Sequence, residues 1–109
     1  VPSYQNYSKR AYFSEVTQAT GPYTLGVNQC YQTQGALTNC NAGSNGVPPA
    51  ISKTTGRVAS VAVAAGVITV TPVASNGIAA TDTYVLTPTV SNNTLTWAPS
   101  GGCVSSGVC

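Results

Sequence analysis

Residues 12–30 read YFSEVTQATGPYTLGVNQC, and their apolar side chains recur in steps of three or four residues. The recurring positions are Tyr12, Val16, Ala19, Tyr23, Val27 and Cys30. This spacing places all of them on one stripe of a helix, which is typical of a helix that packs on a core. We therefore expect a helix over residues 1–31. Gly21-Pro22 interrupts the pattern, and proline removes a main-chain hydrogen bond, so a kink or break is expected there.

From Arg57 onward the period of the apolar residues changes to two, which indicates β-strands. Strands are expected over residues 57–63, 67–72, 83–90 and 94–98, with turns at 64–66 and 91–93. Pro88 suggests an edge or a bulge in the third strand. Four consecutive strands joined by short loops predict an antiparallel meander, and the helix has to cover one of its faces. The expected fold class is α+β, with a long N-terminal helix packed on a four-stranded antiparallel sheet.

With 109 residues, the chain has the size of one domain. We expect a single domain over 1–109, in which the helix (1–31) leads through a connecting loop (32–56) to the sheet (57–98). A C-terminal cap over 99–109 follows the last strand. The loop is long, but it is rich in glycine, proline and small polar residues.

Charged residues make up only 6% of the chain, against roughly 25% in average soluble proteins. The complete set is Lys9, Arg10, Lys53, Arg57, Glu15 and Asp82. A net charge of +2 is too small to indicate nucleic-acid binding, because affinity for phosphate backbones grows with the number of aligned cations. The polar surface must come from serine, threonine, asparagine, glutamine and glycine, which suits a secreted or surface protein.

Four cysteines, Cys30, Cys40, Cys103 and Cys109, stand in a chain without histidine. Their spacings do not match the short two-residue knuckles of zinc sites, so disulfides in an oxidising compartment are the better interpretation. Three connectivities are possible. Cys30–Cys40 and Cys103–Cys109 are favoured because each closes a short loop, whereas a pairing between the two segments stays open. Because neither a signal peptide nor an apolar span of about 20 residues is present, we expect the protein's N-terminus to have been removed.

The inventory of chemical groups argues against an enzyme. The chain lacks a histidine base, and its two carboxylates, Glu15 and Asp82, fall on a predicted helix and at a predicted strand start. Neither a Gly-x-Ser-x-Gly elbow nor a phosphate-binding glycine-rich loop is present. We therefore expect no catalytic residue, cofactor, bound metal or small-molecule substrate.

A second helical face carries Tyr4, Tyr7 and Ala11, spaced three and four residues apart. Surface tyrosines often need no explanation. Exposed aromatic patches also mark interfaces. If these tyrosines mark an interface, the segment that carries them projects beyond the core and packs against other copies of the chain.

Three stretches resemble one known family. The opening VPSYQNYSKRAYFSEV is similar to the part of a type IV pilin that follows its membrane-spanning helical half, where Pro-x-Tyr-x-x-Tyr leads into an amphipathic helix. GRVASVAVAAGVITVTP resembles the family's first hairpin, and YVLTPTVSNNTLTWAPSGGC resembles its final hairpin. A C-terminal disulfide that bounds a surface loop is common in this family, and a bond between Cys103 and Cys109 would reproduce it. In the family a cysteine often stands soon after the tryptophan, whereas here five residues (98–102) separate Trp97 from Cys103. The bounded loop (104–108) is also short, so an adhesive role does not carry over directly.

The resemblance implies a structural subunit of a bacterial surface filament that serves adhesion, twitching motility or DNA uptake. Its partners would be other pilin subunits, with an apolar N-terminal helix held in the inner membrane before assembly and an extracellular location afterwards. In this interpretation Tyr4, Tyr7 and Ala11 form the subunit interface. An alternative is a minor pilin that binds DNA or a host receptor, with Lys53 and Arg57 as weak ligand contacts. A type II secretion pseudopilin is a further alternative.

Overall fold

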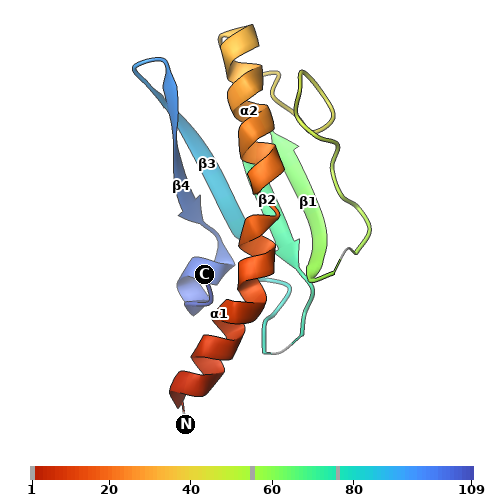
Figure 1. The fold of residues 1–109 in the computed structure, drawn as a ribbon, viewed down its shortest axis with the longest axis vertical. Coiled ribbons are helices and arrows are strands. Elements are labelled where there is room, and N and C mark those ends of the chain that lie inside the picture. Colours follow the sequence, from red (N-terminus) through yellow and green to blue (C-terminus); the bar gives the residue numbers. More distant parts are fainter. Residues whose placement is uncertain (1, 55, 76) are drawn as a thin grey trace.

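The computed structural model describes residues 2–54, 56–75 and 77–109, and within the first helix it describes side chains from Lys9 onward. Two consecutive helices lie across one face of a four-stranded sheet, and a short third helix closes the C-terminus (Figure 1). The elements are α1 Pro2–Gln18, α2 Gly21–Gln34, β1 Val58–Ala64, β2 Val67–Pro72, β3 Tyr84–Ser91, β4 Thr94–Ser100 and α3 Gly102–Ser106. All neighbouring strands are antiparallel, in the order β1-β2-β3-β4. The predicted α+β class and its antiparallel sheet are confirmed.

The long helix expected over 1–31 is divided into α1 and α2, and the division falls at Ala19-Thr20. Pro22 stands in the first turn of α2, where its missing N–H costs no helical hydrogen bond. The helix also continues three residues beyond the predicted end, to Gln34. It stops at Gly35, whose positive φ of 72° lets its N–H donate to the Tyr31 carbonyl oxygen.

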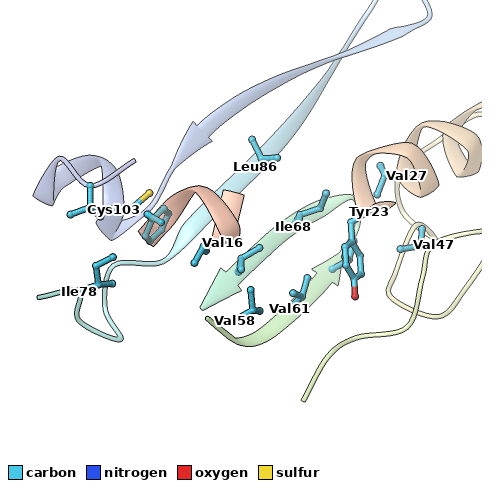
Figure 2. Packing of buried hydrophobic residues seen from close by; sticks show 14 of the residues in the cluster. Val16, Tyr23, Val27, Val47, Val58, Val61, Ile68, Ile78, Leu86 and Cys103 are labelled. Carbon is cyan, nitrogen blue, oxygen red and sulfur yellow. The ribbon is translucent and has the colours of Figure 1, made fainter. Parts of the chain in front are cut away.

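The predicted helical stripe is the face that meets the sheet. Tyr12, Val16, Tyr23, Val27 and Cys30 are buried, and Ala19 is partly buried against the same core. Figure 2 shows Val16 above β2 and Tyr23 beside β1, with Ile68 between the two helical segments. The buried face is wider than predicted. It includes Phe13, which is only 1% exposed and meets the Tyr84 ring edge-on at 6.3 Å between centroids.

Both hairpin turns are tighter than predicted. Ala64 pairs with Val67, so the first turn consists of Ala65 and Gly66 alone, with φ values of 48° and 84°. Ser91 pairs with Thr94, so the second consists of Asn92 and Asn93, also at positive φ. Two-residue turns of this kind match the twist of antiparallel strands.

The β3–β4 hairpin extends beyond the rest of the sheet. β2 pairs with β3 only from Ile68–Val70 to Tyr84–Leu86, whereas β3 pairs with β4 along its whole length. Pro88 therefore lies where β3 has β4 as its partner among the described strands, which explains how a proline is tolerated there. At the opposite edge, Ile51 exchanges main-chain hydrogen bonds with Val61 of β1.

The connecting loop packs closely on α2 at Gly26. A Cβ atom at Gly26 would lie 2.7 Å from Pro48 Cδ and 2.8 Å from the Gly46 carbonyl oxygen. Nearby, the Tyr23 hydroxyl donates to the Pro49 carbonyl oxygen at 2.8 Å. The loop and the helix thus form one packed unit around these two residues.

The substitution Gly26→Ala should destabilise the fold although alanine is the better helix former. Its methyl group overlaps main-chain atoms of the loop, and overpacking of this kind costs about 1–3 kcal/mol, more than the roughly 1 kcal/mol gained in helix propensity. Urea unfolding should show a lower free energy of unfolding for this variant. Asn28→Ala, at an exposed position of the same helix, is the control and should cause no loss. Equal stability of the Gly26→Ala variant and the wild type would contradict the packing argument.

Tyr23 should make stability pH-dependent in alkaline solution. Burial raises the pKa of its hydroxyl above the ordinary value near 10, because the charged form is poorly solvated. The protonated hydroxyl stabilises the fold fully below about pH 10, and this contribution is lost as pH rises through the folded-state pKa. Tyr23→Phe should cost about 1 kcal/mol at pH 7 through loss of the hydrogen bond. Denaturant unfolding should show this difference shrinking above pH 10, and a constant difference would contradict the assignment.

Candidate assembly surfaces and disulfide-bounded segments

The base of the helix is fastened to the sheet by polar contacts around Tyr12. The Tyr12 hydroxyl donates to the Val73 carbonyl oxygen at 3.1 Å, just beyond β2. The Glu15 carboxylate accepts the Arg57 peptide N–H at 2.7 Å, and the Arg57 guanidinium carbon lies 4.5 Å from the Tyr12 ring centroid. Cation–π contact and hydrogen bonds of this kind fix both the rotation and the position of α1 on the sheet.

This arrangement places Arg57, one of the two expected ligand contacts, against α1. Lys53 is exposed in the loop that leads into β1. Ligand binding by Lys53 and Arg57 stays a prediction.

The C-terminal cap is held by a disulfide and by close main-chain contact. Cys103 and Cys109 are joined, with their Cα atoms 5.4 Å apart, and enclose most of α3. The Cys103 N–H donates to the Thr83 carbonyl oxygen at 3.1 Å, so the cap is attached to the segment that enters β3. Cys103 and Val108 are buried, whereas Val104 is exposed, so the cap presents one side to the core and the other to the surroundings.

Gly101 and Gly102 allow the cap to lie close to the segment that enters β3. A Cβ atom at Gly102 would overlap the Thr81 carbonyl oxygen, and one at Gly101 would overlap the Thr83 carbonyl oxygen. Gly101 also has φ of 101°, a conformation that favours glycine. The glycine pair is therefore required by the contact between the cap and the start of β3.

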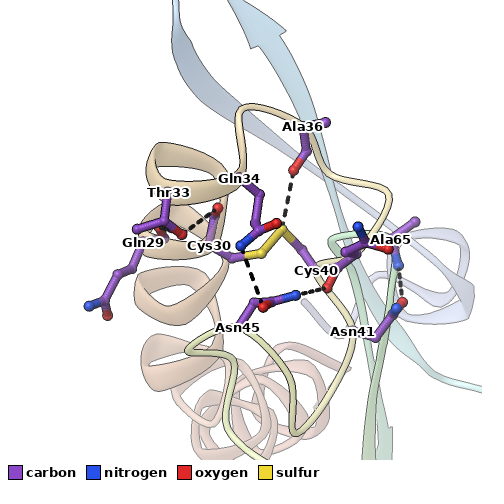
Figure 3. The surroundings of a disulfide bond; sticks show 10 residues. Gln29, Cys30, Thr33, Gln34, Ala36, Cys40, Asn41, Asn45 and Ala65 are labelled. Atoms are coloured by element: carbon purple, nitrogen blue, oxygen red, sulfur yellow. Dashed lines mark hydrogen bonds between the residues drawn. A yellow bond between two sulfur atoms is a disulfide. The ribbon is translucent and has the colours of Figure 1, made fainter.

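The second disulfide joins Cys30 of α2 to Cys40 of the connecting loop, and both residues are fully buried. Figure 3 shows the loop folded back over this bond toward the β1–β2 turn. The Ala65 N–H donates to Asn41 Oδ1 at 2.9 Å, and the Gly66 N–H donates to the Cys40 carbonyl oxygen at 2.8 Å. The disulfide thus connects the end of α2 with the first hairpin. Both disulfides are the pairings favoured from loop length.

Two open hollows lie on opposite flanks of α1. We call the first hollow the basic flank. It has a volume of about 190 Å³ and is lined by Arg10, Phe13, Ser14, Thr17, Val108 and Cys109. We call the second hollow the acidic flank. It has a volume of about 350 Å³ and is lined by Glu15, Gln18, Ala19, Ile51, Gly56 and Val58. In Figure 1 the cap lies beside α1. At the acidic flank, Ile51 and Gly56 bring the loop before β1 next to the helix.

Of the predicted subunit-interface residues, Ala11 is exposed on α1 between these two flanks. Tyr4 and Tyr7 belong to the helical range of α1, but their side chains lie outside the described part of the chain. The interface assignment for all three stays a prediction.

Asp82 has a structural role that the sequence did not indicate. Its carboxylate accepts the Ala79 N–H at 2.9 Å, and its own N–H donates to the Ala79 carbonyl oxygen. It is buried, so it closes the turn before β3. Glu15 is consequently the exposed carboxylate of the two.

The described residues hold no cluster of three or more histidine, cysteine or acidic residues suited to a metal ion. Within the same part of the chain, no helix has the length and apolar character needed to cross a bilayer.

Together, these features define a class of protein: a helical spine packed on a four-stranded meander, with a disulfide-bounded segment at the C-terminus. The solution NMR structure of the major type IV pilin PpdD from enterohemorrhagic Escherichia coli has this fold. The two structures superpose with a TM-score of 0.69 and 32% sequence identity, over 89% of this chain and 71% of PpdD. The chain belongs to the type IV pilin family, and the resemblance seen in the sequence is confirmed.

Two curated relatives agree with this assignment. The type IV pilus subunit protein TapA of Aeromonas hydrophila is 54% identical over 50 residues, which are 46% of this chain and 35% of TapA. Prepilin peptidase-dependent protein D of Escherichia coli K12 is 40% identical over 72 residues, which are 65% of this chain and 47% of that protein. The matches therefore span between about a third and a half of these relatives. No family model matches the chain.

Replacing Gly102 by alanine should loosen the C-terminal cap. The methyl group overlaps the Thr81 carbonyl oxygen, so the cap has to shift, at a cost of about 1–3 kcal/mol. The expected results are a lower free energy of unfolding and faster proteolysis after residue 100. Ser105→Ala, at an exposed position in α3, is the matched control and should behave like the wild type. Unchanged protease resistance in the Gly102→Ala variant would refute the role assigned to the glycine pair.

Proposed function

We propose that this chain is the head of a structural subunit that assembles into type IV pili on the bacterial surface. The observation that carries the proposal is the match to the major pilin PpdD, which extends over 89% of the chain at 32% identity. The similarity to the pilus subunit TapA supports the same function.

The shape of the chain supports assembly through its N-terminal helix. The molecule measures 49 × 30 × 17 Å, and α1 lies toward one end of the long axis with its N-terminus beyond the sheet (Figure 1). An apolar helical segment preceding α1 would extend this axis, anchor the subunit in the inner membrane and later form the filament core. Ala11, with Tyr4 and Tyr7, would then lie where the core meets the heads.

The two disulfides are consistent with an extracellular location in the filament. In the chain-entropy model, loops of this size contribute about 2–3 kcal/mol each, without requiring a larger core. They hold the connecting loop and the cap, the two irregular segments that border the helical spine.

Deleting the complete gene should remove filaments from the cell surface, and the gene supplied on a plasmid should restore them. Electron microscopy of sheared and cell-bound filaments, together with immunogold labelling of the head, measures both outcomes. The 109-residue chain alone should sediment as a monomer, because no helix among its described residues is long and apolar enough to form a bundle core. Unchanged, unlabelled pili on the deletion strain would reject a role as the major subunit.

A further inference from the structure

The two flanks of α1 carry opposite charges at positions suited to contact between neighbouring subunits. Arg10 and Glu15 are both exposed on α1 and are five residues apart. In an α-helix this separation turns the side chains about 140° apart and shifts them about 7.5 Å along the axis. One helix therefore presents a cation on one flank and a carboxylate on the other.

Each flank offers a built surface around its charge. The basic flank has an apolar floor of Phe13 and Val108, and its Arg10 guanidinium is steadied by donation from Nε to the Gly107 carbonyl oxygen at 3.3 Å. A guanidinium has five N–H donors, so those of the two terminal nitrogens can serve a partner. The acidic flank has apolar walls of Ala19, Ile51 and Val58, which suit the aliphatic stem of a long cationic side chain.

The Glu15 carboxylate can still accept hydrogen bonds from a cationic side chain of a neighbouring subunit. It accepts the Arg57 peptide N–H through Oε2, and a carboxylate has further acceptor positions on both oxygens. The Arg57 guanidinium itself packs over the Tyr12 ring. Asp82 is buried in its turn, so Glu15 is the carboxylate that this surface offers to an arginine.

We propose that the basic flank of one subunit docks on the acidic flank of the next, with Arg10 of one copy paired to Glu15 of its neighbour. The occupant of each flank is a second copy of this chain, argued from charge complementarity. Different patches meet in this contact, so it is heterologous, and heterologous contacts that do not close on themselves build helical filaments. Between parallel helices, the offset between Arg10 and Glu15 would favour an axial stagger of about 7.5 Å. The inference rests on the proposed assembly into pili and adds a contact that sets the stagger between subunits.

The test uses the complete gene with single and mixed charge reversals. Arg10→Glu gives a subunit with two acidic flanks, and Glu15→Arg gives one with two basic flanks. Expressed alone, each should lower the filament yield about tenfold or more, the change expected from 1.4 kcal/mol per contact. Expressed together in one cell, the two variants should co-assemble into filaments that contain both. Gln32→Glu, which adds a negative charge at an exposed position of α2, is the control and should leave the yield unchanged.

The mixed experiment separates pairing from misfolding, because two misfolded subunits cannot rescue each other. Filament yield and composition are measured by shearing and mass spectrometry. Wild-type yields from either single variant overturn the Arg10–Glu15 contact while the proposed function stands. So does failure of the mixture to restore filaments when both variant heads keep the wild-type free energy of unfolding. A wild-type protein that forms no filaments rejects the proposed function, and the inference falls with it.

Discussion

Burial of one helical face against the sheet is the contact on which the rest of the structure depends. Val16 and Val27 of the helices and Ile68 and Val70 of β2 are all fully buried in one cluster. A four-stranded sheet has one apolar face that must be covered, and burying each such side chain contributes about 1.5–3 kcal/mol. Both disulfides and the loop contacts act at the ends of this layer, where the helix and the strands no longer cover one another.

Apolar packing alone would leave the helix free to rotate or slide on the sheet, because dispersion and the hydrophobic effect have little directionality. Three polar contacts at the base of α1 remove this freedom. Tyr12 reaches the end of β2, Glu15 reaches the peptide N–H before β1, and Arg10 reaches the cap. In a chain with so few charges, Arg10 and Glu15 of α1 are thus both used to position the helix.

Local periodicity was enough to predict the fold class, the helical stripe and the order of the strands, because each depends on residues close in sequence. The features that were missed depend on contacts between distant segments. Phe13 follows Tyr12 on the helix, but only the fold places Tyr84 of β3 against its ring. Gly101 and Gly102 look like an ordinary flexible linker until Thr81 and Thr83 are placed against them. The two flanks likewise depend on where the cap and the loop before β1 meet α1, so no sequence pattern could locate them.

The same reasoning applies to contacts between subunits in a filament. A bundle of apolar helices has strong cohesion but poorly defined stagger, since neighbouring turns present similar surfaces. The stagger therefore has to be set by groups whose interactions depend on direction. A pair of opposite charges surrounded by apolar side chains is suited to this, because an incorrect stagger brings like charges together, which is unfavourable. Arg10 and Glu15 lie on the helix that would continue into such a bundle, on opposite flanks and at different heights. The helix that orders the domain can therefore also order its neighbours, with the same few charges performing both tasks.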